Sequence, residues 1–267
     1  MPESFEPRVF GKTGARVGPL GIGSSYGIDA KGVEEAFERG VNYFYWGWRR
    51  RDGMRDGLRY ILRQNREKAF ITIPSLAPTN PMIRYSVERA LKALNTDYID
   101  GLHFFLRKEK PPWRSQLEPA LKLKEEGKIQ HIGISSHHRP NFPDFLGEPF
   151  SEFYHVRYNA KHRGAESDVF PKLPPKGDPD RPGIVAFTVT SWKQLIKANP
   201  KKLGDLAIPT AGDCYRFALS HPDVDVCITG AANAEQMRHA LDAIDKGPMT
   251  DDELGWMRKV GDRLYKK

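Results

Sequence analysis

The chain has 267 residues, with 42 Lys and Arg against 34 Asp and Glu, which gives a formal net charge of +8. Hydrophobic residues make up 39% and charged residues 28%, a composition that excludes an intrinsically disordered chain and fits a globular domain. No run approaches the roughly 18 apolar residues of a membrane span, and the first residues lack the apolar segment of a signal peptide. We therefore expect one domain over 1–267 and no membrane partner.

Cysteine and charge content narrow the functional classes further. Cys214 and Cys227 are too few for a disulfide framework, and no CxxC pair exists to hold zinc or a cluster. This usage favours a reduced, cytoplasmic setting. The excess of positive charge is too dilute to predict a nucleic-acid partner and instead suggests an anionic small ligand. The histidines match no zinc spacing, so we expect no metal.

Short β-branched runs alternate with longer amphipathic runs along most of the chain. The expected strands are 19–25, 42–47, 69–75, 98–106, 130–136, 154–159, 184–190 and 225–229. The expected helices are 30–39, 54–64, 81–94, 114–126, 211–220, 235–244 and 251–264, with a short helix at 142–146 and a long loop at 171–182.

These eight strand–helix units, each of about 30 residues, predict a closed (β/α)8 TIM barrel whose active site lies at the carboxyl ends of the strands. The alternative is an open doubly wound sheet, but the turn at Gly21–Gly23 lacks the third glycine typical of that fold. The segment Arg8–Val17 predicts an N-terminal β-hairpin that could close the bottom of the barrel. The helix at 251–264 would be a C-terminal addition.

Five segments in order make the sequence similar to the aldo-keto reductase family over essentially its whole length. They are Phe10–Val17 with Leu20–Gly23, Gly40–Phe44, Leu94–Asp100, Gly127–Ser136 and Ile228–Met237. Members of that family reduce carbonyls with NADPH, using an Asp, a Tyr, a Lys and a His.

The resemblance breaks at all four of those catalytic positions. Tyr45 replaces the aspartate, the segment 48–53 holds no tyrosine, Ile73 or Pro74 replaces the lysine, and Phe105 replaces the histidine. Loss of a single member of a buried Lys–Asp pair would strand a charge at a cost of about 3–5 kcal/mol, whereas loss of both avoids it. We therefore expect a remodelled pocket with an apolar floor, in which the usual proton relay cannot operate and the pKa of Tyr45 stays at or above about 10.

The resemblance implies a better preserved cofactor side that would take NADP or NAD. Ser135, Ser136 and His155 fall where the family binds the nicotinamide amide, Phe187 where an aromatic ring stacks, and Thr188 where pyrophosphate is contacted. The remaining candidate cofactor-binding residues are Ser24, Gly230, Ala231 and Gln236. Gln236, His239 and Ala240 replace the residues that grip the adenosine end, which leaves the choice between NADP and NAD open.

Two residues are candidates for proton transfer, each with a structural alternative. Tyr45 either donates a proton to a substrate carbonyl or packs in place of the lost ion pair. His137, in a loop after the fifth strand, has the right chemistry for proton transfer near neutrality. His103 points to the same side of its strand as Phe105, but deeper, and we expect it to be a buried structural residue.

Further residues are candidates for contacts with a small-molecule substrate. They are Tyr26, Trp46, Arg49, Phe105 and Arg157. Arg49–Arg51 either form a solvated surface or orient a carboxylate or phosphate. The charged stretch that begins at Arg157 is either a solvated loop or a ligand clamp.

Three functions remain compatible with these residues. The first is an oxidoreductase that reduces a small, optionally anionic carbonyl by a non-standard proton path. The second is a non-catalytic NAD(P)- or ligand-binding protein that acts as a sensor or an assembly partner. The third is lyase or isomerase chemistry in the remodelled pocket.

Overall fold

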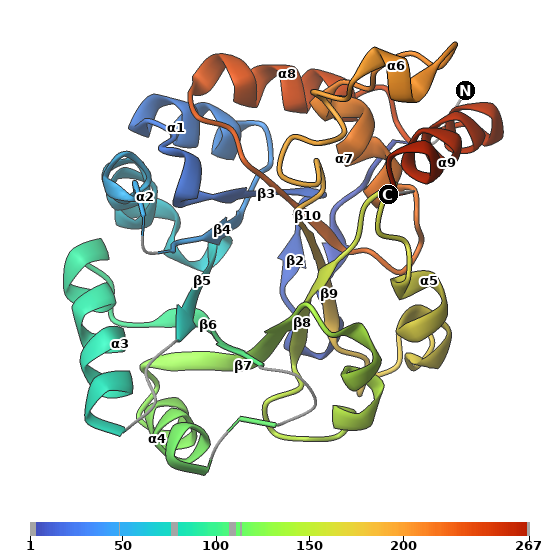
Figure 1. Ribbon diagram of the computed structural model, residues 1–267. Helices are drawn as coiled ribbons and strands as arrows, with labels where there is room; N and C mark the ends of the chain where they lie inside the picture. The colour runs from blue at the N-terminus through green and yellow to red at the C-terminus, as the bar shows by residue number, and fades with distance from the viewer. Residues whose placement is uncertain (1–3, 48, 76–79, 107–110, 113, 266–267) are drawn as a thin grey trace.

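A computed structural model describes residues 4–47, 49–75, 80–106, 111–112 and 114–265. Eight parallel strands close into a barrel in the order β10-β3-β4-β5-β6-β7-β8-β9. They are β3 Leu20–Gly23, β4 Tyr43–Tyr45, β5 Phe70–Ser75, β6 Ile99–Phe105, β7 Ile129–Ser136, β8 Phe153–Arg157, β9 Gly183–Phe187 and β10 Val226–Thr229. The helices surround this ring (Figure 1), which confirms the predicted (β/α)8 fold.

Seven of the described helices match predicted ones with small shifts at their ends, and two helices of four residues each, at 165–168 and 200–203, lie where no helix was expected. The described helices are α1 Ala30–Glu38, α2 Asp52–Asn65, α3 Asn80–Leu94, α4 Arg114–Glu125, α5 Ala165–Asp168, α6 Pro200–Leu203, α7 Ala211–Leu219, α8 Ala234–Ile244 and α9 Asp251–Tyr265. Two 3-10 turns, Arg139–Asn141 and Pro143–Phe145, replace the short helix expected after the fifth strand. Each turn carries a proline near its start, which favours a short turn over a longer helix. No helix of the described residues is long and apolar enough to cross a membrane.

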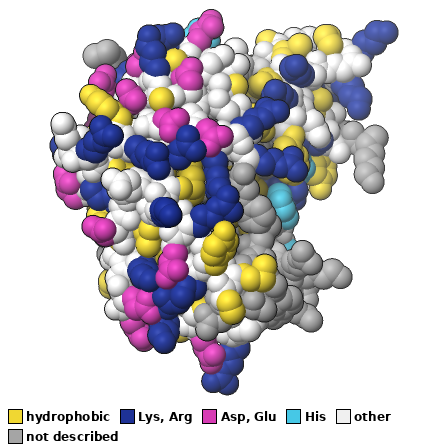
Figure 2. Space-filling model, turned by 90° about the vertical axis from the view of Figure 1, so that its left-hand side faces the viewer, with side chains coloured by type: hydrophobic (Ala, Val, Ile, Leu, Met, Phe, Trp, Pro, Cys, Tyr) yellow, Lys and Arg dark blue, Asp and Glu magenta, His cyan; other side chains and the backbone are white. Residues whose placement is uncertain are grey.

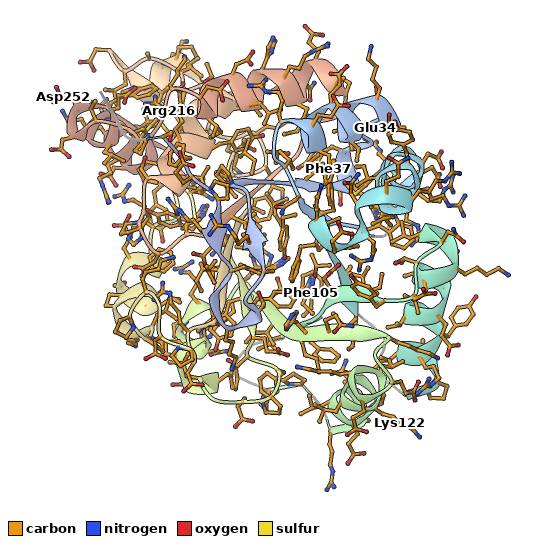
Figure 3. All side chains as sticks on the ribbon, turned by 180° about the vertical axis from the view of Figure 1, so that it is seen from behind. Glu34, Phe37, Phe105, Lys122, Arg216 and Asp252 are labelled. Atoms are coloured by element: carbon orange, nitrogen blue, oxygen red, sulfur yellow. The ribbon has the colours of Figure 1, made fainter. Side chains whose placement is uncertain are left out.

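The predicted hairpin closes the end of the barrel where the strands begin. Its strands, β1 Arg8–Val9 and β2 Arg16–Val17, pair antiparallel. Phe10 between them is fully buried and contacts the rings of Tyr43, Phe70 and Phe153, with centroid distances of 5.4, 5.2 and 5.8 Å. Seen from behind, the hairpin crosses the ring of strands (Figure 3). Any opening for a ligand therefore lies at the opposite end.

The same kind of hydrogen bond joins neighbouring strands at four places around that closed end. A side-chain oxygen at or just before the start of one strand accepts a backbone N–H at or near the start of the strand before it, which for β7 is its fourth residue, at 2.7–2.9 Å. The pairs are Gly18 with Asn42, Ile71 with Asp100, Ile132 with Glu152 and Ile184 with Asp225. We call these four pairs the strand-start bonds. They satisfy buried N–H groups that strand pairing leaves free.

The C-terminal helix α9 is fixed against the barrel by charge and by close packing. Arg216 of α7, labelled in Figure 3, forms a bidentate ion pair with Glu253 at 2.6 and 2.9 Å. Gly261 lies so close to the chain after β8 that a Cβ at this position would fall 1.9 Å from the carbonyl oxygen of Ala160. This contact positions the loop that follows β8 at the open end of the barrel.

Candidate functional site

A cleft of about 1050 Å³ opens at the carboxyl ends of the strands, opposite the hairpin. It runs from Tyr45 and Phe105 inside the ring of strands to Lys246 at the end of α8. Eleven of the candidate residues line it: Tyr26, Tyr45, Arg49, Phe105, Ser135, His155, Phe187, Thr188, Gly230, Ala231 and Gln236. The barrel topology therefore brings together residues from most of the length of the chain.

Three further candidates lie behind the wall of the cleft rather than in it. The Ser24 hydroxyl accepts the backbone N–H of Gly47 at 3.0 Å, and the Ser136 hydroxyl accepts that of His138 at 3.0 Å. Trp46 is 3% exposed within the main core, and its indole N–H donates to the carbonyl of Arg51 at 3.3 Å. These side chains hold the ends of strands and the loops that follow them.

The three arginines after β4 point in different directions. Arg49 lines the cleft. The side chain of Arg50 packs near Gly27, and the guanidinium of Arg51 lies over the Trp46 ring at 4.4 Å. Only Arg49 is therefore placed to meet a ligand in the cleft. Trp48, in the segment where the family has its tyrosine, lies outside the described residues.

Side-chain direction along β5 decides which residue occupies the position of the family lysine. The Thr72 hydroxyl bonds to His103 Nδ1 inside the barrel at 3.1 Å. Because side chains alternate along a strand, Pro74 shares the inner face with Thr72, and Ile73 faces the helices with the main core. No cation from β5 therefore reaches the floor of the cleft.

The floor beneath the cleft is aromatic and polar, so the expectation of an apolar floor is wrong. A hydrogen bond of 2.8 Å joins Tyr43 Oη to His155 Nε2. The His155 ring lies 4.3 Å from that of His103, and Tyr45 lies 5.4 and 5.8 Å from those two rings. His103 is fully buried, as predicted, and its Nε2 has no hydrogen-bond partner. Polar rings therefore fill the interior of the barrel beneath the cleft.

Burial sets the protonation state of these rings. It raises the pKa of Tyr45 to about 12, which confirms the prediction from the sequence, and it lowers the pKa of His155 to about 3. The pKa of His103 falls well below its usual value because of burial and the neighbouring His155. At neutral pH the floor therefore presents a neutral phenol and neutral imidazoles.

The segment after β9 forms one side of the cleft in an unusual backbone conformation. Ser191, Trp192 and Lys193 have consecutive positive φ angles of 50°, 51° and 70°, although none is glycine. Each such residue costs about 1–2 kcal/mol, and strain of this kind concentrates at functional sites. The turn directs Trp192 and Lys193 to the cleft, where Lys193 lies 5.9 Å from the Tyr26 ring on the opposite side. Thr188 Oγ1 is buried at this wall without a hydrogen-bond partner.

The charges that line the cleft are mostly positive. Its basic residues are Arg49, Lys193, Lys197 and Lys246, and its one carboxylate among the described residues is Asp242. Asp242 is already paired with Arg39 at 2.9 Å. The cleft therefore attracts an anionic ligand. Across the described chain, no three His, Cys, Asp or Glu side chains converge to hold a metal ion.

The start of α8 forms the far wall. Asn233 caps this helix by accepting the N–H of Gln236 at 2.9 Å, and the Gln236 amide oxygen accepts the N–H of Ala232 at 3.0 Å. Gly230 packs under the Tyr26 ring, which lies 2.7 Å from where a Cβ would be. The helix N-terminus thus adds positive electrostatic potential to this side of the cleft.

The sequence pattern missed several lining residues. Trp192, Lys193, Lys197, Tyr215 and Lys246 line the cleft but were not among the candidates. The left-handed turn at 191–193 lacks the glycine that marks such turns, so no local signal announces it. Lys193 and Lys197, two cations four residues apart after β9, are the sequence signal of this wall.

The chain is similar in fold to solved aldo-keto reductase structures and in sequence to an oxidoreductase. An aldo-keto reductase, AKR11C1 from Bacillus halodurans in its holo form, superposes with a TM-score of 0.78 and 21% identity over 96% of both chains. An aldo/keto reductase from Klebsiella pneumoniae, solved in complex with NADP and acetate, gives a TM-score of 0.75 and 20% identity over 98% of this chain and 96% of that one. The sequence is 22% identical to an uncharacterized oxidoreductase, YrpG, of Bacillus subtilis (strain 168), over 90% of this chain and 91% of that protein.

No family model matches the sequence. At identities of 20–22% these likenesses establish the fold of the chain. The chemistry of the cleft depends on the residues that line it.

Proposed function

We propose that the protein is an NAD(P)H-dependent oxidoreductase similar to the aldo-keto reductases, which reduces a small carbonyl compound. The observation that carries this proposal is the long cationic cleft at the carboxyl ends of the barrel strands, with the Phe187 ring at its inner part. A dinucleotide combines a flat aromatic base, which suits an aromatic side chain, with phosphates, which suit lysines and a helix N-terminus.

The residues present fit such a cofactor. Phe187 would stack on the nicotinamide, with Ser135 and His155 beside its amide. Thr188 supplies an unpaired buried hydroxyl at the wall where the phosphates would lie. Lys193, Lys197 and Lys246 would meet the phosphates, and this surplus of cations favours NADP over NAD. Aldo-keto reductase structures of the same fold from Klebsiella pneumoniae contain NADP in one case and NADPH in the other, which supports this assignment.

The bound dinucleotide would supply a hydride to the carbonyl carbon of the substrate. The residues of this chain would bind the substrate over Phe105 and Tyr45 and donate the proton that the carbonyl oxygen needs. Three tyrosines line the cleft, and Tyr45 is the candidate donor because it is the one that belongs to a barrel strand, beside the buried rings of the floor. With a pKa of about 12 it is fully protonated at neutral pH but is a weak acid, since no cation stabilises its phenolate. We therefore expect slow reduction of ordinary aldehydes.

Replacement of Tyr45 tests this role. Tyr45→Phe keeps the ring and removes the proton, so kcat for NADPH-dependent reduction of an aromatic aldehyde should fall by about 10²-fold or more, with little change in KM. Because the pKa of Tyr45 is about 12, the parent protein should show no alkaline loss of kcat from this group below about pH 11. Measured pH–rate profiles of both proteins check this. Unchanged kcat in Tyr45→Phe would mean that the ring only packs.

One observation favours a second function, that of a dinucleotide-binding protein without turnover. The pKa of Tyr45 is raised by burial with no compensating charge, so the phenol has no partner that would assist proton donation. Saturable NADPH binding with no oxidation of NADPH across a panel of aldehydes, ketones and oxo acids would select this function over the first.

A further inference from the structure

Arg157 is a partly buried cation whose side chain has no partner among the described residues. It ends β8 opposite Phe187 of β9, two residues beyond His155 and on the same face of the strand. Within the described part of the chain its guanidinium makes no hydrogen bond or ion pair, and its Nε is buried. Burying guanidinium N–H groups without a hydrogen-bond acceptor costs free energy. A site that keeps such a group is therefore suited to a ligand that supplies the acceptor.

The surface elsewhere shows the contrast. On the face formed by α1, α2 and α3, Lys and Arg side chains are interspersed with Asp and Glu (Figure 2). Arg55 pairs there with Asp52 at 2.7 Å and Arg84 with Glu126 at 2.6 Å. Arg55 and Arg84 on that face therefore have partners within the protein.

The neighbours of Arg157 add positive charge rather than cancel it. Arg139 lies close enough to Arg157 to lower its pKa, and the charges of Arg157, Arg139 and Lys161 lower the pKa of His162, whereas the hydroxyl of Tyr265 in α9 acts on Arg157 in the opposite direction. The nearby carboxylates are engaged with other residues. Asp168 lies 3.4 Å from Arg139, Glu166 is held by Arg258 at 2.8 and 2.9 Å, and Asp262 is held by Arg163 at 2.6 Å.

His162 is fixed in one tautomer beside this charge. Asn159 donates its Nδ2–H to the carbonyl of Thr188 at 2.9 Å, so its Oδ1 is an acceptor, and it accepts the N–H groups of Lys161 and His162. His162 Nδ1, at 3.3 Å from the same oxygen, is therefore the protonated ring nitrogen. Burial and the surrounding cations lower the pKa of His162 to about 4, so its Nε2 is unprotonated at neutral pH. A bound anion would offset the positive charge around the ring and favour protonation of Nε2.

His137 connects this region to the cleft. Its ring lies 5.3 Å from Phe187 and 6.0 Å from Trp192, both of which line the cleft. Arg49, the cation on the other side of the cleft, is exposed and therefore surrounded by solvent, which weakens its attraction for a ligand. The stronger anion site is thus on the β8 side.

We propose that Arg157, with His137 and His162, binds an oxyanion of the substrate, a carboxylate or a phosphoryl group, next to Phe187. This rests on the proposed function, which it deepens by naming the substrate class: a carbonyl compound that carries such an anionic group. The planar guanidinium fork presents parallel N–H donors that match the geometry of both groups.

The test uses inorganic phosphate and oxalate as probes on the full-length protein saturated with NADPH, followed by NMR of the histidine ring protons. Both anions should shift the His137 and His162 signals saturably and raise the pKa of His162 towards its ordinary range. Arg157→Gln should weaken the anion affinity by about 10-fold or more, and Arg157→Lys should weaken it less because it keeps the charge but not the fork. Lys122→Gln, which removes one exposed charge on α4, should leave it unchanged.

The same variants separate this site from the cofactor cleft. NADPH affinity, measured by fluorescence without the anions, should be unchanged in Arg157→Gln. A parallel loss of NADPH affinity would assign Arg157 to the cofactor and overturn the proposal, as would equal anion affinity in parent and Arg157→Gln. If only phosphate or only oxalate shifts the His137 and His162 signals, the result supports the site and identifies the anionic group that it binds. Anion binding in a protein that fails to bind NADPH would retain the site and reject the proposed oxidoreductase.

Discussion

Tyr43 and His155 face each other inside the barrel at 2.8 Å, and His103 lies against His155. These buried rings fill the space beneath the cleft without a charge. Their neutrality is imposed by burial, which lowers the pKa of both imidazoles. The cost of protonating either one in the folded state makes the stability of the protein depend on pH.

The direction of that dependence follows from the folded and unfolded pKa values. Unfolded His155 binds a proton below about pH 6.5, whereas the folded residue does so only near pH 3. The free energy of unfolding should therefore fall as the pH drops below about 6.5, by about 1.4 kcal/mol per pH unit for this residue. Urea denaturation at pH 7 and pH 5 measures it. His155→Gln, which can keep the bond to Tyr43, should reduce the difference by about 2 kcal/mol.

His239→Gln is the matched control because this histidine is exposed. It should keep the pH dependence of the parent. An equal pH dependence in His155→Gln and in the parent would show that the buried ring is not the source.

At the scale of the elements, the strand-start bonds fix the closed end of the barrel. Each one ties two successive strands, so that together they couple β3 with β4, β5 with β6, β7 with β8, and β9 with β10. Asp225 is the most buried of the four acceptors, at 1% exposure, and it also contacts Lys176. Of the four acceptors, its removal should therefore lower the free energy of unfolding most.

Asp225→Ala should leave the N–H of Ile184 buried without an acceptor and lower the free energy of unfolding by about 1–3 kcal/mol. Asp225→Asn keeps an amide oxygen at this position and should be less destabilised. Urea denaturation of the three proteins measures both effects. Equal stability of the parent and Asp225→Ala would show that the repeated bond is incidental.

The order of the elements could be predicted from the sequence, because each strand is a short apolar run and each helix has one apolar stripe. The directions of side chains at strand ends could not. Ser136 and Trp46 were assigned to ligands, yet they face a loop and the core, since a shift of one residue at a strand end reverses the face. The same alternation places Pro74, and not Ile73, on the inner face.

Two features of the site could not be predicted from the sequence. The isolation of Arg157 depends on which carboxylates the loop after β8 and the helix α9 engage elsewhere. The left-handed turn at 191–193 forms without a glycine. Neither feature has a signature within a few residues of the chain, so neither can be found by periodicity or turn chemistry.

For the molecule as a whole, the barrel is closed at one end and cationic at the other. The hairpin fills the end where the strands begin, and the cleft at the other end extends outward along α8. Helix α9 holds the loop after β8 at the rim, where Arg157 lies beside the cleft. This asymmetry suits a long anionic cofactor in the cleft and a small anionic substrate at the mouth.

The most direct test of this account is a titration of the protein with NADPH, followed by the fluorescence of the dinucleotide and of tryptophan. The account predicts saturable binding that weakens as salt is raised, because lysines line the cleft. It also predicts that Phe187→Ala weakens binding by about 10-fold, since stacking on an aromatic ring contributes about 1–3 kcal/mol, while Lys122→Gln changes nothing. The absence of saturable binding at millimolar NADPH, or equal affinity in Phe187→Ala, would contradict it.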